Sequence, residues 1–236
     1  MRSLVIIKTG QTYPDIRAEL GDFEDWFMAG LRHPALTLSV HNPIVGDPLP
    51  TEADGIVITG SPAMVSDREP WSEQTADWLR KMIQLDTPVL GVCYGHQLLA
   101  HAFGGEVGYR PQGREMGTLS VRLQDPAGGD ALFSSFPNEF LAHLTHRQSV
   151  LQLPPGAIRL AGSDQEMNQA FRIGSAAWGV QFHPEFTVPV MRAYLSRLGP
   201  DLQREGLDPQ ALSDSITETP QASALLARFA SLVAQR

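Results

Sequence analysis

The sequence has only one cysteine, Cys93, among its 236 residues. A lone cysteine cannot form an intramolecular disulfide, and it cannot build a thiolate zinc site by itself. Cys93 is therefore either a small buried side chain or a reactive thiol, and the residues around it have to distinguish these two roles.

Basic residues and long apolar runs are also scarce. Eighteen Lys and Arg residues stand against 26 Asp and Glu residues, and the formal charge of -8 has the wrong sign for a surface that follows phosphates. No apolar run approaches the about 20 residues of a membrane-spanning helix. No signal-peptide cleavage pattern follows Met1. We expect no nucleic-acid partner, no membrane association, and a soluble, cytoplasmic protein.

The hydrophobic content of 42% is enough for a large core, and the apolar runs indicate the fold. Residues 4–7, 54–59 and 88–92 read as buried parallel strands, and residues 16–31 and 71–85 have helical patterns between them. This alternation predicts an α/β fold with a doubly wound, mostly parallel sheet, in which ligands bind at the carboxyl ends of the strands.

The pattern changes after Gly105. Alternating segments separated by turn residues predict antiparallel additions to the sheet at 117–123, 139–144, 157–161 and 176–182.

The last part of the sequence predicts helical structure. Gly199-Pro200 reads as a loop, and residues 221–233 have a helical composition with an apolar face. We therefore expect one large domain over 1–198 and a helical C-terminal appendage over 199–236, without a second independent domain.

Cys93 stands in a pattern that is typical of a nucleophile. Residues 88–104 read as a strand, a tight turn and an amphipathic helix, with Cys93 on the turn between Gly91 and Gly95. A nucleophile on such a turn has a strained backbone and needs glycine on both sides, because side chains there would collide with neighbouring backbone. The start of a helix also stabilises a thiolate and offers N–H groups to an oxyanion. The alternative is a small buried cysteine without a chemical role.

A second chemical pattern follows later in the chain, where His183 ends an apolar strand and Glu185 stands beyond it, across Pro184. A cysteine nucleophile needs an imidazole that takes its proton and returns it to a leaving amine, and the imidazole needs a carboxylate that fixes its tautomer. Pro184 restricts the backbone between the two side chains. The alternative is a strand end with a surface carboxylate.

Together, G-V-C-Y-G-H-Q around Cys93 and Q-F-H-P-E-F around His183 resemble the paired signatures of class I glutamine amidotransferases. The likeness is greatest to the glutaminase portion of GMP synthetase and to the stand-alone γ-glutamyl peptidases. The resemblance implies that Cys93 is the nucleophile, His183 the general base and acid, and Glu185 the orienting carboxylate. It implies no metal and no organic cofactor, and it leaves the tail from about Gly199 outside.

The same resemblance implies an oxyanion hole. The turn Thr59-Gly-Ser-Pro62 follows a predicted strand and is similar to the family turn S-G-G-P, so Gly60 and Ser61 supply one backbone donor and Tyr94 the second. Ser61 replaces a common glycine, but a backbone donor does not depend on its side chain. A plain β-turn is the alternative.

Four residues are implied in substrate binding: Gln97, His146, Arg147 and Gln148. Gln97 lies one helical turn after Cys93 on the same face. Residues 144–150 resemble the family segment S-H-G-D-x-V, which contacts the α-groups of the substrate through its backbone. This sequence departs from that segment, because Arg147 stands where GMP synthetase has glycine and Gln148 where it has aspartate.

The remaining charged and imidazole side chains carry weaker signals. Arg114 lies in a segment similar to an active-site loop of the family, where it either pairs a carboxylate or is a solvated loop arginine. His96 and His101 are five residues apart on one predicted helix, and His143 and His146 have no carboxylate or cysteine cluster beside them in the sequence. We therefore expect no metal site.

Three functions fit these residues. The chain is a stand-alone hydrolase or transferase of a γ-glutamyl substrate, a glutaminase subunit that delivers ammonia to a synthetase partner in trans, or a non-catalytic binding relative. An exposed apolar patch beside Cys93 would favour the second function, whereas the intact catalytic set opposes the third. Neither a dinucleotide fingerprint nor a P-loop is present, so we expect no ATP-binding synthetase domain in this chain.

Overall fold

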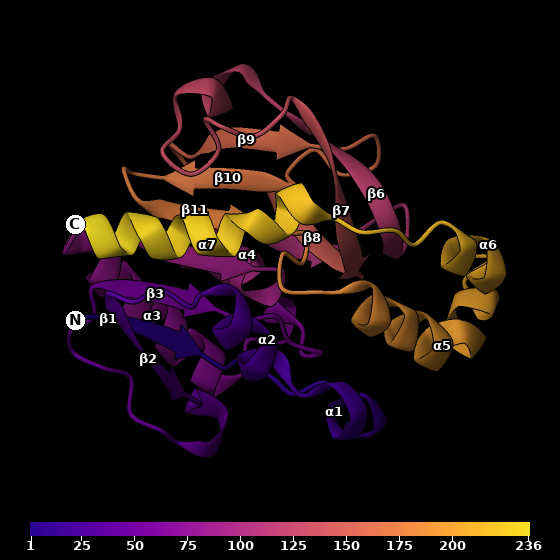
Figure 1. The fold of residues 1–236 in the computed structure, drawn as a ribbon, viewed down its shortest axis with the longest axis horizontal. Coiled ribbons are helices and arrows are strands. Elements are labelled where there is room, and N and C mark those ends of the chain that lie inside the picture. Colours follow the sequence, from indigo (N-terminus) through magenta and orange to yellow (C-terminus); the bar gives the residue numbers. More distant parts are fainter.

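A computed structural model describes residues 1–236, which form a central sheet with helices on both faces (Figure 1). The nine strands of this sheet follow the order β2-β1-β3-β4-β11-β10-β9-β6-β7. Their bounds are β1 Arg2–Ile7, β2 Leu36–His41, β3 Gly55–Ile58, β4 Val89–Val92, β6 Glu115–Leu123, β7 Glu139–His146, β9 Ile158–Gly162, β10 Ala170–Ile173 and β11 Ala177–Val180. A second sheet pairs β5 (Glu106–Tyr109) with β8 (Gln148–Gln152).

Strands β2, β1, β3, β4 and β11 run parallel to their neighbours, and β10, β9, β6 and β7 extend the sheet in antiparallel pairs. The predicted α/β class, with a parallel sheet and antiparallel additions, is confirmed. Strands β2, β5, β8 and β10 have no counterpart among the predicted segments. Each is partly exposed along its length, so its apolar signal in the sequence is weak.

The helices are α1 Pro14–Leu20, α2 Phe23–Gly30, α3 Pro70–Gln84, α4 Tyr94–Ala102, α5 Val188–Arg204, α6 Pro209–Asp214 and α7 Pro220–Gln235. The single helix predicted over 16–31 was wrong, because the chain breaks between α1 and α2. Gly21 ends α1 with a φ of 84°, a conformation that favours glycine. Asp22 then caps α2 in a capping box with Asp25.

Alternate residues of the parallel strands face two different cores. In β1, Leu4 and Ile6 pack in one core with α2 and α7, whereas Val5 and Ile7 pack in the other with α3 and α4. All four side chains are buried. Burial on both faces explains why these strands read as continuous apolar runs.

The predicted C-terminal helix is present as α7, which crosses one face of the sheet (Figure 1). It fits against glycines of earlier elements. A Cβ atom on Gly30 would collide with Leu226, and one on Gly55 would lie 2.5 Å from Val233. Leu226, Phe229 and Val233 are fully buried, so α7 is part of the main core.

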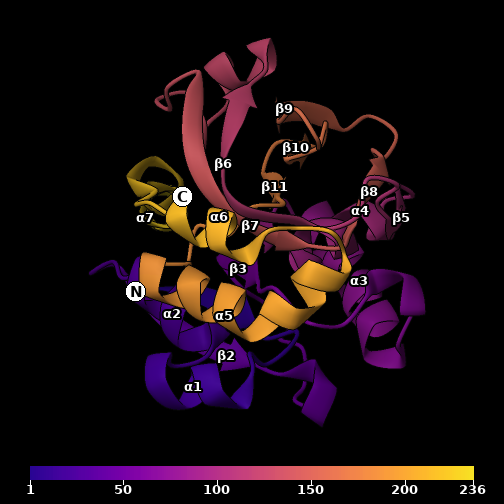
Figure 2. The same ribbon diagram turned by 90° about the vertical axis from the view of Figure 1, so that its right-hand side faces the viewer.

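Gly199-Pro200 lies inside α5, so the prediction of a loop there was wrong. Pro200 removes one backbone donor, but buried Leu198 and Leu202 continue the apolar face of the helix across it, and packing outweighs that local cost. The predicted boundary after residue 198 therefore falls within a helix, which packs beside α1 (Figure 2). No helix of the structure is both long enough and apolar enough to cross a membrane.

Candidate active site

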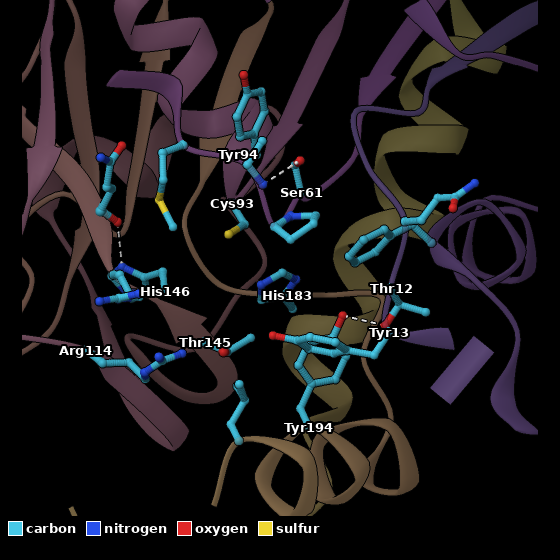
Figure 3. Close-up of a pocket in the computed structure, with 18 of the residues that line it drawn as sticks. Thr12, Tyr13, Ser61, Cys93, Tyr94, Arg114, Thr145, His146, His183 and Tyr194 are labelled. Atoms are coloured by element: carbon cyan, nitrogen blue, oxygen red, sulfur yellow. Dashed lines mark hydrogen bonds between the residues drawn. The ribbon is translucent and has the colours of Figure 1, made fainter. Parts of the chain in front are cut away.

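A cavity of about 290 Å³ opens at the carboxyl ends of the parallel strands. Residues that follow β1, β3, β4 and β11 line it, as expected for a doubly wound sheet. The lining brings together, from separate parts of the sequence, Ser61, Cys93, Gln97, His146 and His183 (Figure 3).

Cys93 occupies the strained turn that the sequence predicts. Its φ of 50° and ψ of -98° lie in a region that side chains rarely adopt. The flanking glycines permit the turn. A Cβ atom on Gly91 would collide with the carbonyl of Gly95, and one on Gly95 would lie 2.5 Å from the carbonyl oxygen of Ile58. The thiol is held at the start of α4 and lines the cavity.

His183 and Glu185 form a buried pair beside this thiol. The Nδ1 atom of His183 lies 2.7 Å from Oε1 of Glu185. The ring of Phe186 stacks on the imidazole with 4.1 Å between centroids, which fixes the plane of the imidazole. The Nε2 atom is buried, has no hydrogen-bond partner, and belongs to a ring that faces Cys93 across the cavity (Figure 3).

The charges around His183 favour its protonated form. Burial by itself lowers the pKa of His183, but the Glu185 carboxylate and the Cys93 sulfur outweigh burial and raise it to about 10. The backbone carbonyl of His143 accepts the N–H of His183 at 2.9 Å. Burial, followed by the charge of His183, lowers the pKa of His143 to about 4, so this second imidazole stays neutral. The resting site therefore holds an imidazolium that stabilises a thiolate at Cys93.

The turn predicted to form the oxyanion hole lies next to the thiol. A Cβ atom on Gly60 would lie 3.2 Å from Cε1 of His183 and 3.8 Å from Cβ of Cys93, so glycine permits this approach. The Oγ atom of Ser61 accepts the N–H of Ala63 at 3.0 Å, which leaves the backbone of Ser61 as the candidate donor. Tyr94 is the first residue of α4, so its N–H has no carbonyl partner within the helix.

The four predicted substrate-binding residues all line the cavity, but most of their side-chain groups are already engaged. The Nε2 atom of Gln97 donates to the carbonyl of Gln148 at 2.8 Å and to Oε1 of Gln181 at 2.9 Å. The side chain of Gln148 turns away and donates to Oγ of Ser66 at 2.6 Å. Arg147 is exposed, with its guanidinium 5.9 Å from the centroid of the Tyr109 ring.

The ring of His146 is enclosed by protein groups. Its Nδ1 atom lies 2.9 Å from the carbonyl oxygen of Gln148, and its Nε2 atom lies 2.7 Å from Oε2 of Glu115. Arg114 pairs with Glu205 through two hydrogen bonds of 2.8 and 3.0 Å, which confirms that it pairs a carboxylate.

Nothing in the sequence marked the wall of the cavity near His183. Tyr13, Tyr194 and Leu198 line the cavity there, and they come from the start of the chain and from α5. The two tyrosine rings meet edge to face at 5.7 Å, and the hydroxyl of Tyr194 hydrogen-bonds Oγ1 of Thr12 at 2.7 Å. Periodicity could have marked Tyr194 and Leu198 as one face of a helix, but not as part of a site.

Comparison with known proteins places this site in a family. Residues 22–198 match the family described as glutamine amidotransferase class-I. The chain belongs to the class I glutamine amidotransferases. The separate glutamine-hydrolysing subunit of the GMP synthase of Archaeoglobus fulgidus is 34% identical over 176 residues, which cover 72% of this amidotransferase and 86% of that protein.

Other relatives of this amidotransferase differ in length. Gamma-glutamyl peptidase 5 of Arabidopsis thaliana is 31% identical over 147 residues, which cover 61% of this chain and 59% of that one. The chain spans about a quarter of the undivided GMP synthases that it matches, for example 24% of the Porphyromonas gingivalis protein at 37% identity. A glutamine amidotransferase from Thermotoga maritima has the same fold, with a TM-score of 0.78 over all of both chains at 22% identity.

Proposed function

We propose that this amidotransferase hydrolyses the γ-amide of glutamine or of a γ-glutamyl compound through a thioester on Cys93, without a second protein. One observation carries the proposal. A thiol on a strained turn and a buried, protonated imidazole line the same cavity, with Glu185 hydrogen-bonded behind the imidazole. Such a set activates a nucleophile and supplies a proton to a leaving amine.

The chemistry follows from these positions. The Cys93 sulfur attacks the γ-carbonyl carbon, and the carbonyl oxygen takes up the negative charge opposite the N–H groups of Tyr94 and of the Gly60-Ser61 turn. As the carbon–nitrogen bond breaks, His183 gives its proton to the nitrogen and the amine leaves. His183 then takes a proton from water, which attacks the thioester and releases the carboxylate and the thiolate.

The aromatic wall favours a substituted amide. Because His183 must reach the departing nitrogen, the amine leaves on the side of the cavity where His183 lies. The cavity continues there along Tyr13, Tyr194 and Leu198. Ammonia alone has no use for such a wall, whereas an amine that carries an organic substituent would pack against it. The wall therefore supports the stand-alone function on γ-glutamyl amines or peptides.

The second candidate is a glutaminase subunit that delivers ammonia to a synthetase partner in trans. The relation to a separate glutamine-hydrolysing subunit of a GMP synthase favours it. In that case glutamine is the substrate, and the partner completes the oxyanion hole before hydrolysis begins. For either function we keep the prediction that the protein works in the cytoplasm.

The deciding experiment is steady-state kinetics on the purified chain with glutamine, γ-glutamyl amines and γ-glutamyl peptides, in which released ammonia, amine and glutamate are measured. Cys93→Ala is the control. Release from a γ-glutamyl substrate that is lost in the control supports the stand-alone function. Background release that rises by orders of magnitude only when a synthetase is added replaces it with the subunit function. No Cys93-dependent release under either condition identifies a non-catalytic relative.

A further inference from the structure

Glu115 and His146 face each other across two antiparallel strands. Glu115 is the first residue of β6, His146 is the last of β7, and the register of the pair puts them directly opposite. Their side chains are 1% and 2% exposed, and Oε2 of Glu115 lies 2.7 Å from Nε2 of His146. No role in the proposed chemistry has been given to Glu115 so far.

The neighbours of His146 determine how many protons its ring carries. Nδ1 faces the backbone carbonyl of Gln148 and Nε2 faces the Glu115 carboxylate, and both of these groups only accept hydrogen bonds. Both ring nitrogens must therefore donate, which requires the imidazolium. Ser149 Oγ, at 3.4 Å from Nδ1, is a longer contact than the carbonyl at 2.9 Å.

The carboxylate itself is surrounded by donors. Oε1 of Glu115 accepts from the hydroxyl of Ser163 at 3.2 Å, and Oε2 accepts from Nε2 of Gln169 at 3.0 Å. A proton on either oxygen would face one of these donors. Burial raises the pKa of Glu115, but the hydrogen bond and charge of His146 and the charge of Arg110 outweigh burial and lower it.

The other charged groups nearby do not change this assignment. Arg110 lies 3.6 Å from Glu166, its own buried partner. Burial, followed by the charge of His146, lowers the pKa of His96 to about 3, so His96 is neutral. On the cavity wall, Arg114 is paired with Glu205.

The ion pair has a direction relative to the cavity. His146 lines the cavity and Glu115 lies behind it, so the positive end of the pair faces the substrate. Figure 3 shows His146 and His183 on opposite sides of Cys93. Because the amine leaves towards His183, the rest of a γ-glutamyl substrate, with its α-carboxylate, extends towards His146.

We infer that Glu115 is a positioning residue: it keeps His146 cationic, so that a positive charge faces the α-carboxylate of the substrate and the Nδ1 proton holds the carbonyl of Gln148. Gln97 donates to this same carbonyl, so the pair also anchors the wall beside the nucleophile. His146 makes no hydrogen bond to substrate, because both its nitrogens are occupied. This inference rests on the proposed function.

The test compares Glu115→Gln with Glu166→Gln, which removes a neighbouring buried carboxylate that pairs with Arg110 instead. Glu115→Gln should raise KM for glutamine or the best γ-glutamyl substrate about tenfold while kcat stays within about threefold, because the loss is in binding. For 4-aminobutanamide, which lacks the α-carboxylate, KM should not change. Glu166→Gln should behave as wild type. Equal losses in the two variants, or equal losses for both substrates, would overturn the inference.

The pH dependence of KM separates charge from packing. Wild-type KM should be constant between about pH 6 and 8, whereas KM of Glu115→Gln should fall towards the wild-type value as the pH is lowered and His146 takes a proton from solvent. A KM that is raised equally at all these pH values would assign Glu115 a merely structural role.

Nuclear magnetic resonance tests the protonation without activity and without a variant that must fold. The ring nitrogen shifts of His146 in the wild-type protein should be those of an imidazolium at about pH 7.5, well above the ordinary titration range of a free histidine. Neutral-ring shifts would overturn the inference whether or not the protein hydrolyses any amide. If the shifts are those of an imidazolium and no substrate is turned over, the proposed function fails and the charge assignment stands.

Discussion

The Nδ1 atom of His183 lies 2.7 Å from Oε1 of Glu185, with both side chains buried and only Pro184 between them in the chain. The pair is local in sequence, so a single segment after β11 delivers a complete acid–base unit to the thiol on the turn after β4. The other carboxylate oxygen of Glu185 is buried without a partner, so the carboxylate interacts mainly with the imidazole. Replacing it should change the imidazole more than the fold.

Glu185→Gln should lower the rate by less than His183→Ala and should move the alkaline limb of the pH–rate profile to lower pH. The pKa of His183 is raised to about 10, so the protonated form persists below that pH and is lost as the pH rises through it. Without the carboxylate this pKa falls, and so does the upper limit of activity. The measurement is kcat/KM against pH. A profile identical to that of wild type would make Glu185 a bystander.

Cys93→Ala should abolish turnover, because it removes the only thiol in the chain. A γ-glutamyl diazoketone should label the wild-type protein on Cys93 and leave the variant unmodified, as mass spectrometry of the tryptic peptides would report. Thermal denaturation of the variant is the folding control. Residual hydrolysis at the wild-type rate would contradict the assignment of the nucleophile.

Cys93→Gly should be more stable than Cys93→Ala by about 1 kcal/mol, the reverse of the usual order at helical positions. The reason is the φ of 50° at this residue, which strains any side chain but not glycine. Both variants lack the nucleophile, so the comparison isolates the backbone. The free energies of unfolding in urea provide the measurement. Equal stabilities would mean that the turn stores no strain.

Phe229→Ala should lower the free energy of unfolding by about 3–5 kcal/mol, because it empties a fully buried site between α7 and Trp178. Ser223→Ala, on the exposed face of the same helix, is the matched control and should change stability by less than about 0.5 kcal/mol. A small effect at Phe229 would mean that α7 docks loosely on the sheet.

The chemistry of the site was readable from the sequence where its parts are local. Cys93 lies between Gly91 and Gly95, and His183 stands two positions before Glu185, so short segments carry both signals. The partner of His146 was not readable. Glu115 is 31 residues away, and only the register of β6 on β7 brings the two together. Sequence spacing does not contain strand register when no turn fixes it.

The same contrast holds for the fold. The buried strands β1, β3 and β4 were predicted because burial on both faces leaves a continuous apolar run. The break between α1 and α2 was missed although Gly21-Asp22 is a stop signal followed by a cap, since the apolar spacing on either side still resembled one helix. The helix through Pro200 was missed because packing overrides a local breaker.

The place of α7 in the core also sets the order in which the protein can be completed during synthesis. A ribosome delivers every strand of the sheet before residues 222–233, yet Leu4 and Ile6 share their core with this last helix. One apolar face of the sheet therefore stays open until α7 emerges. A chain that stalls before α7 presents that face to chaperones and proteases, so an unfinished copy is marked for removal before its thiol can act.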